Sequence, residues 1–263
     1  MYSGDEDSIH QLLRSVPQTV STILLKEMTV GEVSYRREAT ARFSAFVEAV
    51  PMEIYDKASG VLIDTARTGM VTVEKSENAM DIDTNDDDDA KSMKRPQQLL
   101  LVAAAIKALQ TILPKDKSIS VCEAAALSQV LCGVAETGVW NTRVASLECL
   151  EALFKHCSAV GTSDDSASSA SIQDLLDGMD VDAILGAIRT CATEGKYVSV
   201  RTAALNAAAA AFDAISAASG SSVEENSRIE ARKADACAIV EMLAKDPVPG
   251  VADMARDVVR RWI

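Results

Sequence analysis

Apolar residues recur at spacings of three and four positions along most of the chain, a period typical of amphipathic helices. In the first stretch, Ile9, Leu12, Leu13, Val16 and Val20 form one apolar stripe. Prolines, glycines and short polar turns separate the periodic segments. We therefore predict helices over residues 9–30, 35–50, 52–66, 97–113, 119–135, 140–157, 172–193, 198–218, 223–244 and 251–262, and no convincing strand.

The helical pattern stops between residues 69 and 95, where the chain becomes polar and acidic. Residues 74–89 carry eight Asp and Glu residues against one base, Lys75. Such a stretch does not bury enough apolar surface to offset the entropy of ordering it. We predict a disordered acidic insertion over 69–95, which separates helices in 1–68 from helix pairs in 96–263 that continue the same array.

The starts of four predicted second helices resemble one another. They read YRREAT (35–40), TRVASL (142–147), VRTAAL (200–205) and VADMAR (251–256). The first three share an arginine, at Arg36, Arg143 and Arg201, and all four share a small residue. The small residues are Ala39, Ser146, Ala204 and Ala255. A small residue lets neighbouring helices approach closely, and the arginine can reach carboxylates or carbonyls of a neighbouring repeat.

Recurrence of a short turn, an arginine and a small residue indicates stacked helix pairs, since one pair alone cannot bury its apolar face. The aligned starts are unevenly spaced, and the acidic insertion and a Ser-rich loop over residues 158–171 account for the excess over a HEAT unit of about 40–47 residues. The predicted fold is all-α, an α-solenoid of about five HEAT-like pairs. A helical bundle closed on itself is the structural alternative.

Two aromatic residues, Trp140 and Tyr197, lie in the turns ahead of second helices, next to the repeat arginines. The favoured interpretation is that they cap the stacked core. The alternative is that they lie on a ridge of turns that a partner protein contacts, where Trp, Tyr and Arg tend to be anchors. The candidate partner-binding residues are therefore Arg36, Trp140, Arg143, Tyr197 and Arg201. The favoured interpretation of these five residues is a structural role as repeat positions.

The net charge of −13 argues against nucleic acid as a partner, because binding phosphates requires a basic surface. The N-terminal residues do not resemble a signal peptide, and no apolar run is long enough to cross a bilayer. The six cysteines lie in apolar helical stretches without a CxxC pair, as buried thiols do in a reducing compartment. We expect a protein of the cytoplasm or the nucleus, without membrane insertion.

No catalytic arrangement is recognisable. No Ser-His-Asp or Cys-His catalytic arrangement can be argued from the two histidines, His10 and His156. There is also no phosphate-binding glycine motif. The aspartates at 86–89 lack the alternating ligands and central glycine of a calcium loop. We predict a protein that is not an enzyme, with no cofactor and no metal site.

Several stretches resemble the C-terminal HEAT region of the proteasome adapter and scaffold family. They are GKYVSVRTAAL (195–205), VWNTRVASLECLEALF (139–154), the helix over 97–113 and SYRREATARF (34–43). The resemblance implies a non-enzymatic scaffold that binds core and regulatory particle subunits of the 26S proteasome and supports its assembly, stability or localisation. The alanine run at 207–211 departs from the family pattern, and members of the family are far longer than this chain.

Two other classes of function stay open. One is another HEAT or armadillo adaptor, such as a transport receptor or a phosphatase scaffold. The other is a helical enzyme, which would need a pocket that gathers titratable groups from several helices.

Overall fold

The computed structural model describes residues 119–160, 171–194, 196–218 and 222–262, together with 102–111, 113 and single positions between 23 and 99. The chain divides into two compact units, Met1–Asp116 and Lys117–Ile263. In the first unit, residues 102–111 are helical and bury Val102, Ile106 and Leu109. The predicted acidic insertion and most of the predicted helices in 1–68 lie outside the described residues, so the predicted domain division stays a prediction.

The second unit consists of helices, and its described residues include no strand. The helices are α5 (Val121–Thr137), α6 (Trp140–Val160), α7 (Ile172–Gly178), α8 (Val181–Glu194), α9 (Val198–Ala217), α10 (Val223–Leu243) and α11 (Pro249–Trp262). Five of them begin and end within about three residues of the predicted bounds. Short turns and glycines marked these bounds in the sequence, because each interrupts the apolar period.

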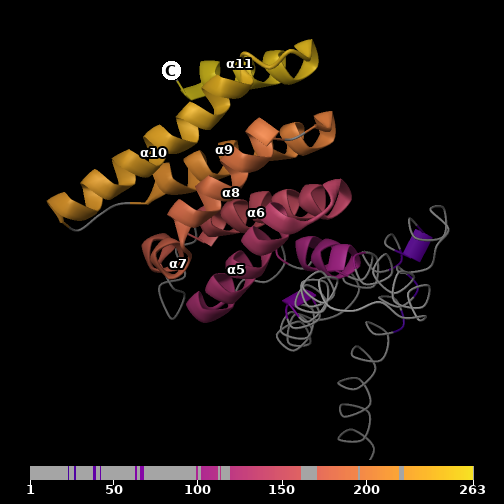
Figure 1. The fold of residues 1–263 in the computed structure, drawn as a ribbon. Coiled ribbons are helices and arrows are strands. Elements are labelled where there is room, and N and C mark those ends of the chain that lie inside the picture. The colour runs from indigo at the N-terminus through magenta and orange to yellow at the C-terminus, as the bar shows by residue number, and fades with distance from the viewer. Residues whose placement is uncertain are drawn as a thin grey trace, which may run out of the picture. The chain divides into compact units, whose positions relative to one another are not determined.

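The helices form pairs that stack in file, as Figure 1 shows. The pairs are α5 with α6, α8 with α9, and α10 with α11. First helices contact first helices, from α5 to α8 to α10, and second helices contact second helices, from α6 to α9 to α11. Two such layers are the arrangement of an α-solenoid, in which each pair buries its apolar face against its neighbours. The predicted fold class is confirmed.

Helix α9 is the centre of this stack. It packs against α6, α8, α10 and α11, and its most extensive contact is with α6. Its alanines at 204, 207, 208, 211 and 214 are fully buried. Because the side chain of alanine is only a methyl group, α6, α8, α10 and α11 can approach α9 closely. The alanine run at 207–211 therefore lies in the helix that makes the most extensive contacts within the unit.

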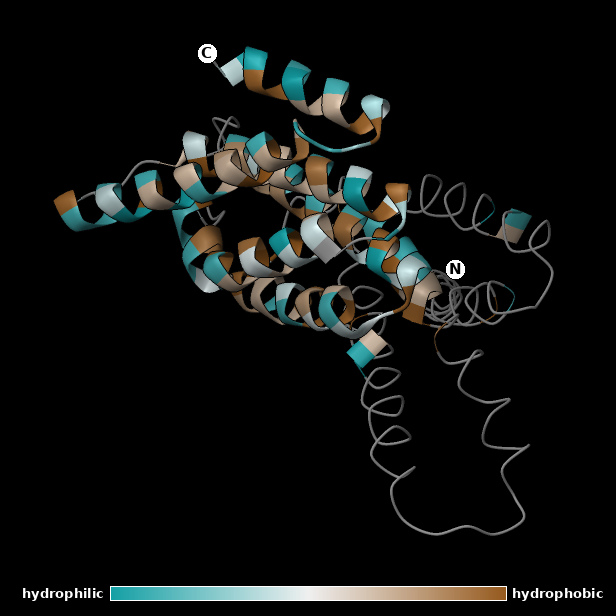
Figure 2. Ribbon diagram, turned by 45° about the horizontal axis from the view of Figure 1, so that its top comes forward, coloured by the Kyte–Doolittle hydropathy of each residue, from teal (hydrophilic) through white to brown (hydrophobic). Residues whose placement is uncertain are grey.

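The outermost helix has a different surface from α9. In Figure 2, α11, which ends at the C label, is hydrophobic on one side and hydrophilic on the other. Val251, Ala252, Ala255 and Val258 are buried on the apolar side. Trp262 stacks on Phe212 of α9, with ring centroids 3.9 Å apart. Helix α11 is thus attached to the rest of the unit by one apolar face and one aromatic contact.

Ion pairs connect the first-helix layer between α8 and α10. The Arg232 guanidinium donates from Nε and Nη2 to the two oxygens of Asp182, at 3.1 and 3.0 Å. Hydrogen bonding from Arg232 lowers the pKa of Asp182. Farther along, Arg189 and Asp235 form a more exposed pair at 2.9 Å. Long charged side chains thus connect α8 and α10, which contact each other less extensively than α6 and α9 do.

The prediction of one helix over 172–193 is wrong. The structure divides this segment into α7 and α8 at Met179 and Asp180, because Met179 adopts an extended backbone with a ψ of 139°. The Asp180 carboxylate accepts a hydrogen bond from the Ala183 amide at 3.1 Å and so caps α8. The apolar period continues across the break, so periodicity alone did not reveal it.

Gly178 ends α7 where that helix meets α5. A Cβ at this position would collide with Cγ1 of Val121, whereas a Cβ at Gly186, inside α8, would meet nothing within 4 Å. We expect Gly178→Ala to lower the free energy of unfolding by about 1–2 kcal/mol through overpacking. The matched change Gly186→Ala should raise it by about 0.5–1 kcal/mol, since alanine favours a helix interior. Urea denaturation checks both, and equal effects of the two changes would contradict the packing argument.

Candidate functional site: the ridge of turns

The turns that join the helices of each pair lie along one edge of the stack. We define the turn ridge as residues 136–140, 196–198 and 245–248. Each turn comes directly before the second helix of its pair, at α6, α9 and α11. The predicted partner-binding residues other than Arg36 lie on this ridge or within four residues of it. Arg36 lies outside the described residues.

The first turn is closed by local hydrogen bonds. Arg143 donates from Nε to the Gly138 carbonyl and from Nη2 to the Glu136 carbonyl, both at 2.7 Å. Thr142, which is fully buried, donates to the Val139 carbonyl at 2.8 Å. A Cβ at position 138 would collide with the Thr142 hydroxyl and the Val134 carbonyl, so glycine is needed there. The predicted reach of the arginine to carbonyls is seen here, although they belong to its own pair.

The second turn is tied to the third by an ion pair. Arg201 of α9 donates from Nε and Nη2 to the two carboxylate oxygens of Asp246, at 2.6 and 3.2 Å. The Val248 amide donates to the same carboxylate at 2.8 Å. Only 3% of the Asp246 side chain and 13% of the Arg201 side chain are exposed. This arginine therefore reaches a carboxylate of the next repeat, as the sequence pattern predicted.

These contacts also set the charge state of Asp246. Burial raises the pKa of its carboxyl group, but hydrogen bonds from Arg201 and the Val248 amide, with the charge of Arg201, outweigh that effect. The pKa of Asp246 therefore lies below its ordinary value. At neutral pH the ridge holds a charged, nearly enclosed pair between consecutive repeats.

The small residues of the repeat pattern are all buried. Ser146, Ala204 and Ala255 are fully buried, and Ala39 is 2% exposed. The Ser146 hydroxyl donates to the Leu131 carbonyl of α5, so this small residue also joins the two helices of its pair. The arginines and small residues thus hold the ridge in place from within.

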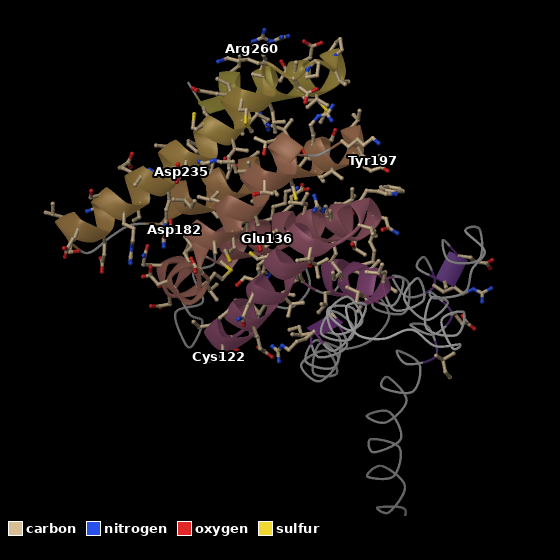
Figure 3. All side chains as sticks on the ribbon, in the orientation of Figure 1. Cys122, Glu136, Asp182, Tyr197, Asp235 and Arg260 are labelled. Carbon is tan, nitrogen blue, oxygen red and sulfur yellow. The ribbon has the colours of Figure 1, made fainter. Side chains whose placement is uncertain are left out.

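The aromatic residues lie on the outside of the ridge. Trp140 is 49% exposed and Tyr197 48% exposed, and their ring centroids lie 5.5 Å apart at a tilt of 36°. Figure 3 shows Tyr197 at the start of α9. Their neighbours Val139 and Val198 are exposed as well. The two turns therefore present one continuous apolar patch to solvent, which we call the aromatic patch.

The described residues offer little nucleophilic or metal chemistry. Burial is the main cause that raises the pKa of the Cys132 and Cys157 thiols to about 12, so both stay protonated at neutral pH. Among the described residues, no cluster of three His, Cys, Asp or Glu side chains has the geometry to hold a metal ion. No described helix has both the length and the hydropathy to span a bilayer.

Comparison with known families decides the relationship of this chain. The family described as ECM29, C-terminal ARM-like repeats, matches residues 11–260. The chain belongs to this family. The match confirms the expected membership in the proteasome adapter and scaffold family and places the chain in its C-terminal region. No curated protein and no solved structure matches the sequence.

Membership in the ECM29 family agrees with the stack of paired helices seen here. Repeat scaffolds of this kind present extended surfaces for binding partner proteins. The sequence singled out the aromatic patch and the arginines of the turns. It did not single out Asp246, although an acidic residue ahead of a proline, at the end of a predicted helix, marks the turn in which it lies.

Proposed function

We propose that this chain is a non-enzymatic scaffold segment that binds the 26S proteasome and supports its assembly, stability or localisation. The observation that carries the proposal is membership in the ECM29 family over residues 11–260. The proposed partners are subunits of the core and regulatory particles. The proposed location is the cytoplasm, with the nucleus as a second compartment.

The aromatic patch supports a role in binding and supplies the proposed contact. Trp and Tyr are enriched among residues that dominate binding energy, because they cover much area at a low entropic cost. Both rings are held at the starts of second helices, where Arg143 and Arg201 fix the turns. A partner would therefore meet a rigid patch, and binding would cost less conformational entropy.

The test is capture of proteasomes by the immobilised chain, followed by mass spectrometry. We expect the chain to retain intact 26S particles, and the double change Trp140→Ala and Tyr197→Ala to weaken capture about tenfold. Val223→Ala is the matched control, since Val223 is 88% exposed at the start of α10, away from the ridge. Circular dichroism checks that each variant stays folded.

The outcomes separate the proposal from its alternative. Recovery of transport cargo or phosphatase subunits in place of proteasome subunits would favour another kind of adaptor and reject the proposal. If the double variant and Val223→Ala retain proteasomes as well as the unchanged chain does, the aromatic patch is not the contact surface.

A further inference from the structure

Helix α10 is packed unevenly along its length. We call residues 223–235, its first half, the arm. The structure describes all of the arm, and within it only Ile229 and Arg232 are buried. The start of the arm extends past the ends of the neighbouring helices in Figures 1 and 2. The shorter second half of α10 buries four aliphatic residues, Ala236, Ile239, Val240 and Leu243.

Three arginine–aspartate pairs connect the arm to α7 and α8. Arg228 donates from Nη2 to Asp177 of α7 at 2.9 Å. The other two are the pairs of α10 with α8 described above, in which Arg232 of the arm meets Asp182 and Asp235 of the arm meets Arg189. Figure 3 labels Asp182 and Asp235, which come from the two facing helices. In each of the three pairs, at least one side chain is well exposed to solvent.

The two halves of α10 are therefore held by different forces. Aliphatic burial holds the second half, whereas the arm depends largely on attraction between exposed charges, which salt screens. Each exposed pair contributes little by itself, so detaching the arm costs less than detaching the second half. The Ser222 capping box and the pair of Lys233 with Glu230 lie within the arm and its cap. They favour the helix without attaching it to its neighbours.

We propose that the arm is a charge-held strap, which swings off α7 and α8 while the second half of α10 stays packed on the stack. The three ion pairs close the strap, and ionic strength or a charged partner segment sets how often it opens. The strap opens without unfolding the rest of the unit. This inference goes beyond the proposed function, because it concerns the movement of one helix and holds whatever the partner is.

Hydrogen exchange of the full chain, read by mass spectrometry, tests the inference. A detached helix end of this length frays, so its amides exchange. Between 10 mM and 1 M sodium chloride the Debye length falls from about 30 Å to about 3 Å. We expect amides in 226–235 to exchange about fivefold faster or more at the higher salt, and amides in 236–243 and α9 to change less than twofold.

An arm whose exchange does not respond to salt would overturn the inference. So would an equal acceleration in the arm, in residues 236–243 and in α9, because that result would show opening of the whole unit.

Two variants loosen the arm at 10 mM salt without changing its own sequence. We expect Asp177→Asn to speed exchange of the arm about threefold, since it removes the partner of Arg228. Arg189→Asp should speed it more, because it places like charges opposite each other. Adding Asp235→Arg to Arg189→Asp reverses that pair and should return the exchange of the arm to within twofold of the unchanged chain.

Asp253→Asn is the matched control, since it breaks an exposed pair that lies within α11, between Asp253 and Arg256. It should leave the exchange of the arm unchanged. If it speeds that exchange as much as Asp177→Asn does, the total charge and not the contact with α7 governs the arm. If the reversed pair does not restore slow exchange, packing and not charge holds the arm. Either result would overturn the inference.

Discussion

Asp246→Asn is expected to lower the free energy of unfolding of the second unit by about 2–3 kcal/mol, since it removes the carboxylate charge that faces the enclosed Arg201 guanidinium. Asparagine keeps the size of the side chain and can still accept from the Val248 amide. The loss therefore reports the charge pair and not the shape of the turn. This loss lies at or below the lower end of the range of about 3–5 kcal/mol for a broken buried pair, because the pair sits at a turn close to solvent.

Urea denaturation followed by tryptophan fluorescence measures this effect, because both tryptophans, Trp140 and Trp262, belong to the second unit. The matched control is Asp235→Asn, which breaks the exposed pair with Arg189. That pair should contribute no more than about 0.5 kcal/mol. Similar losses for the two variants would contradict the distinction between an enclosed pair and an exposed one.

The same pair makes the stability of the unit depend on pH. Because the pKa of Asp246 is lowered in the folded state, its contribution is complete above the ordinary value of 3.8 and is lost as the pH falls through the folded value. We expect the unchanged chain to lose more stability on acidification than Asp246→Asn does. Parallel losses in the two proteins would show that other carboxylates govern the acid transition.

Ala208→Leu is expected to lower the free energy of unfolding by about 2–3 kcal/mol or more. Ala208 is fully buried in α9, the helix that four others enclose, so the added carbons have no room. Alanine and leucine have similar helix propensities, so the change does not act through the helix itself. Urea denaturation with tryptophan fluorescence again provides the measurement.

Ala217→Leu, at the exposed end of the same helix, is the control. It makes the same chemical change where there is space for it, and we expect less than about 0.5 kcal/mol. If Ala208→Leu were as stable as the control, the interior around α9 would have to be loosely packed, which contradicts the burial seen here.

Most of the second unit could be predicted from the sequence, because the bounds of its helices depend on residues that are close together in the chain. Turn glycines and the apolar period placed α5, α6, α9, α10 and α11, and the recurring small residues identified where helices meet. The break between α7 and α8 was missed, because the apolar period continues across Met179 and Asp180, where the backbone becomes extended.

Contacts across the repeats explain what else the sequence did not reveal about the candidate sites. Arg201 and Asp246 are 45 residues apart, and no local pattern connects them. The sequence placed Trp140 and Tyr197 in recognisable turns, but it did not reveal the contact between their rings. Their role as partner-binding residues stays a prediction.

The alanine-rich interior around α9 bears on how the unit comes apart. In a chain of repeats that touch only their neighbours, segments can in principle melt one after another from an end. Here the middle helix is shared by the pairs on both sides, so losing it removes the support of both at once. When force is applied between its two ends, the segment over residues 121–262 should therefore unfold in one cooperative step and not one helix pair at a time.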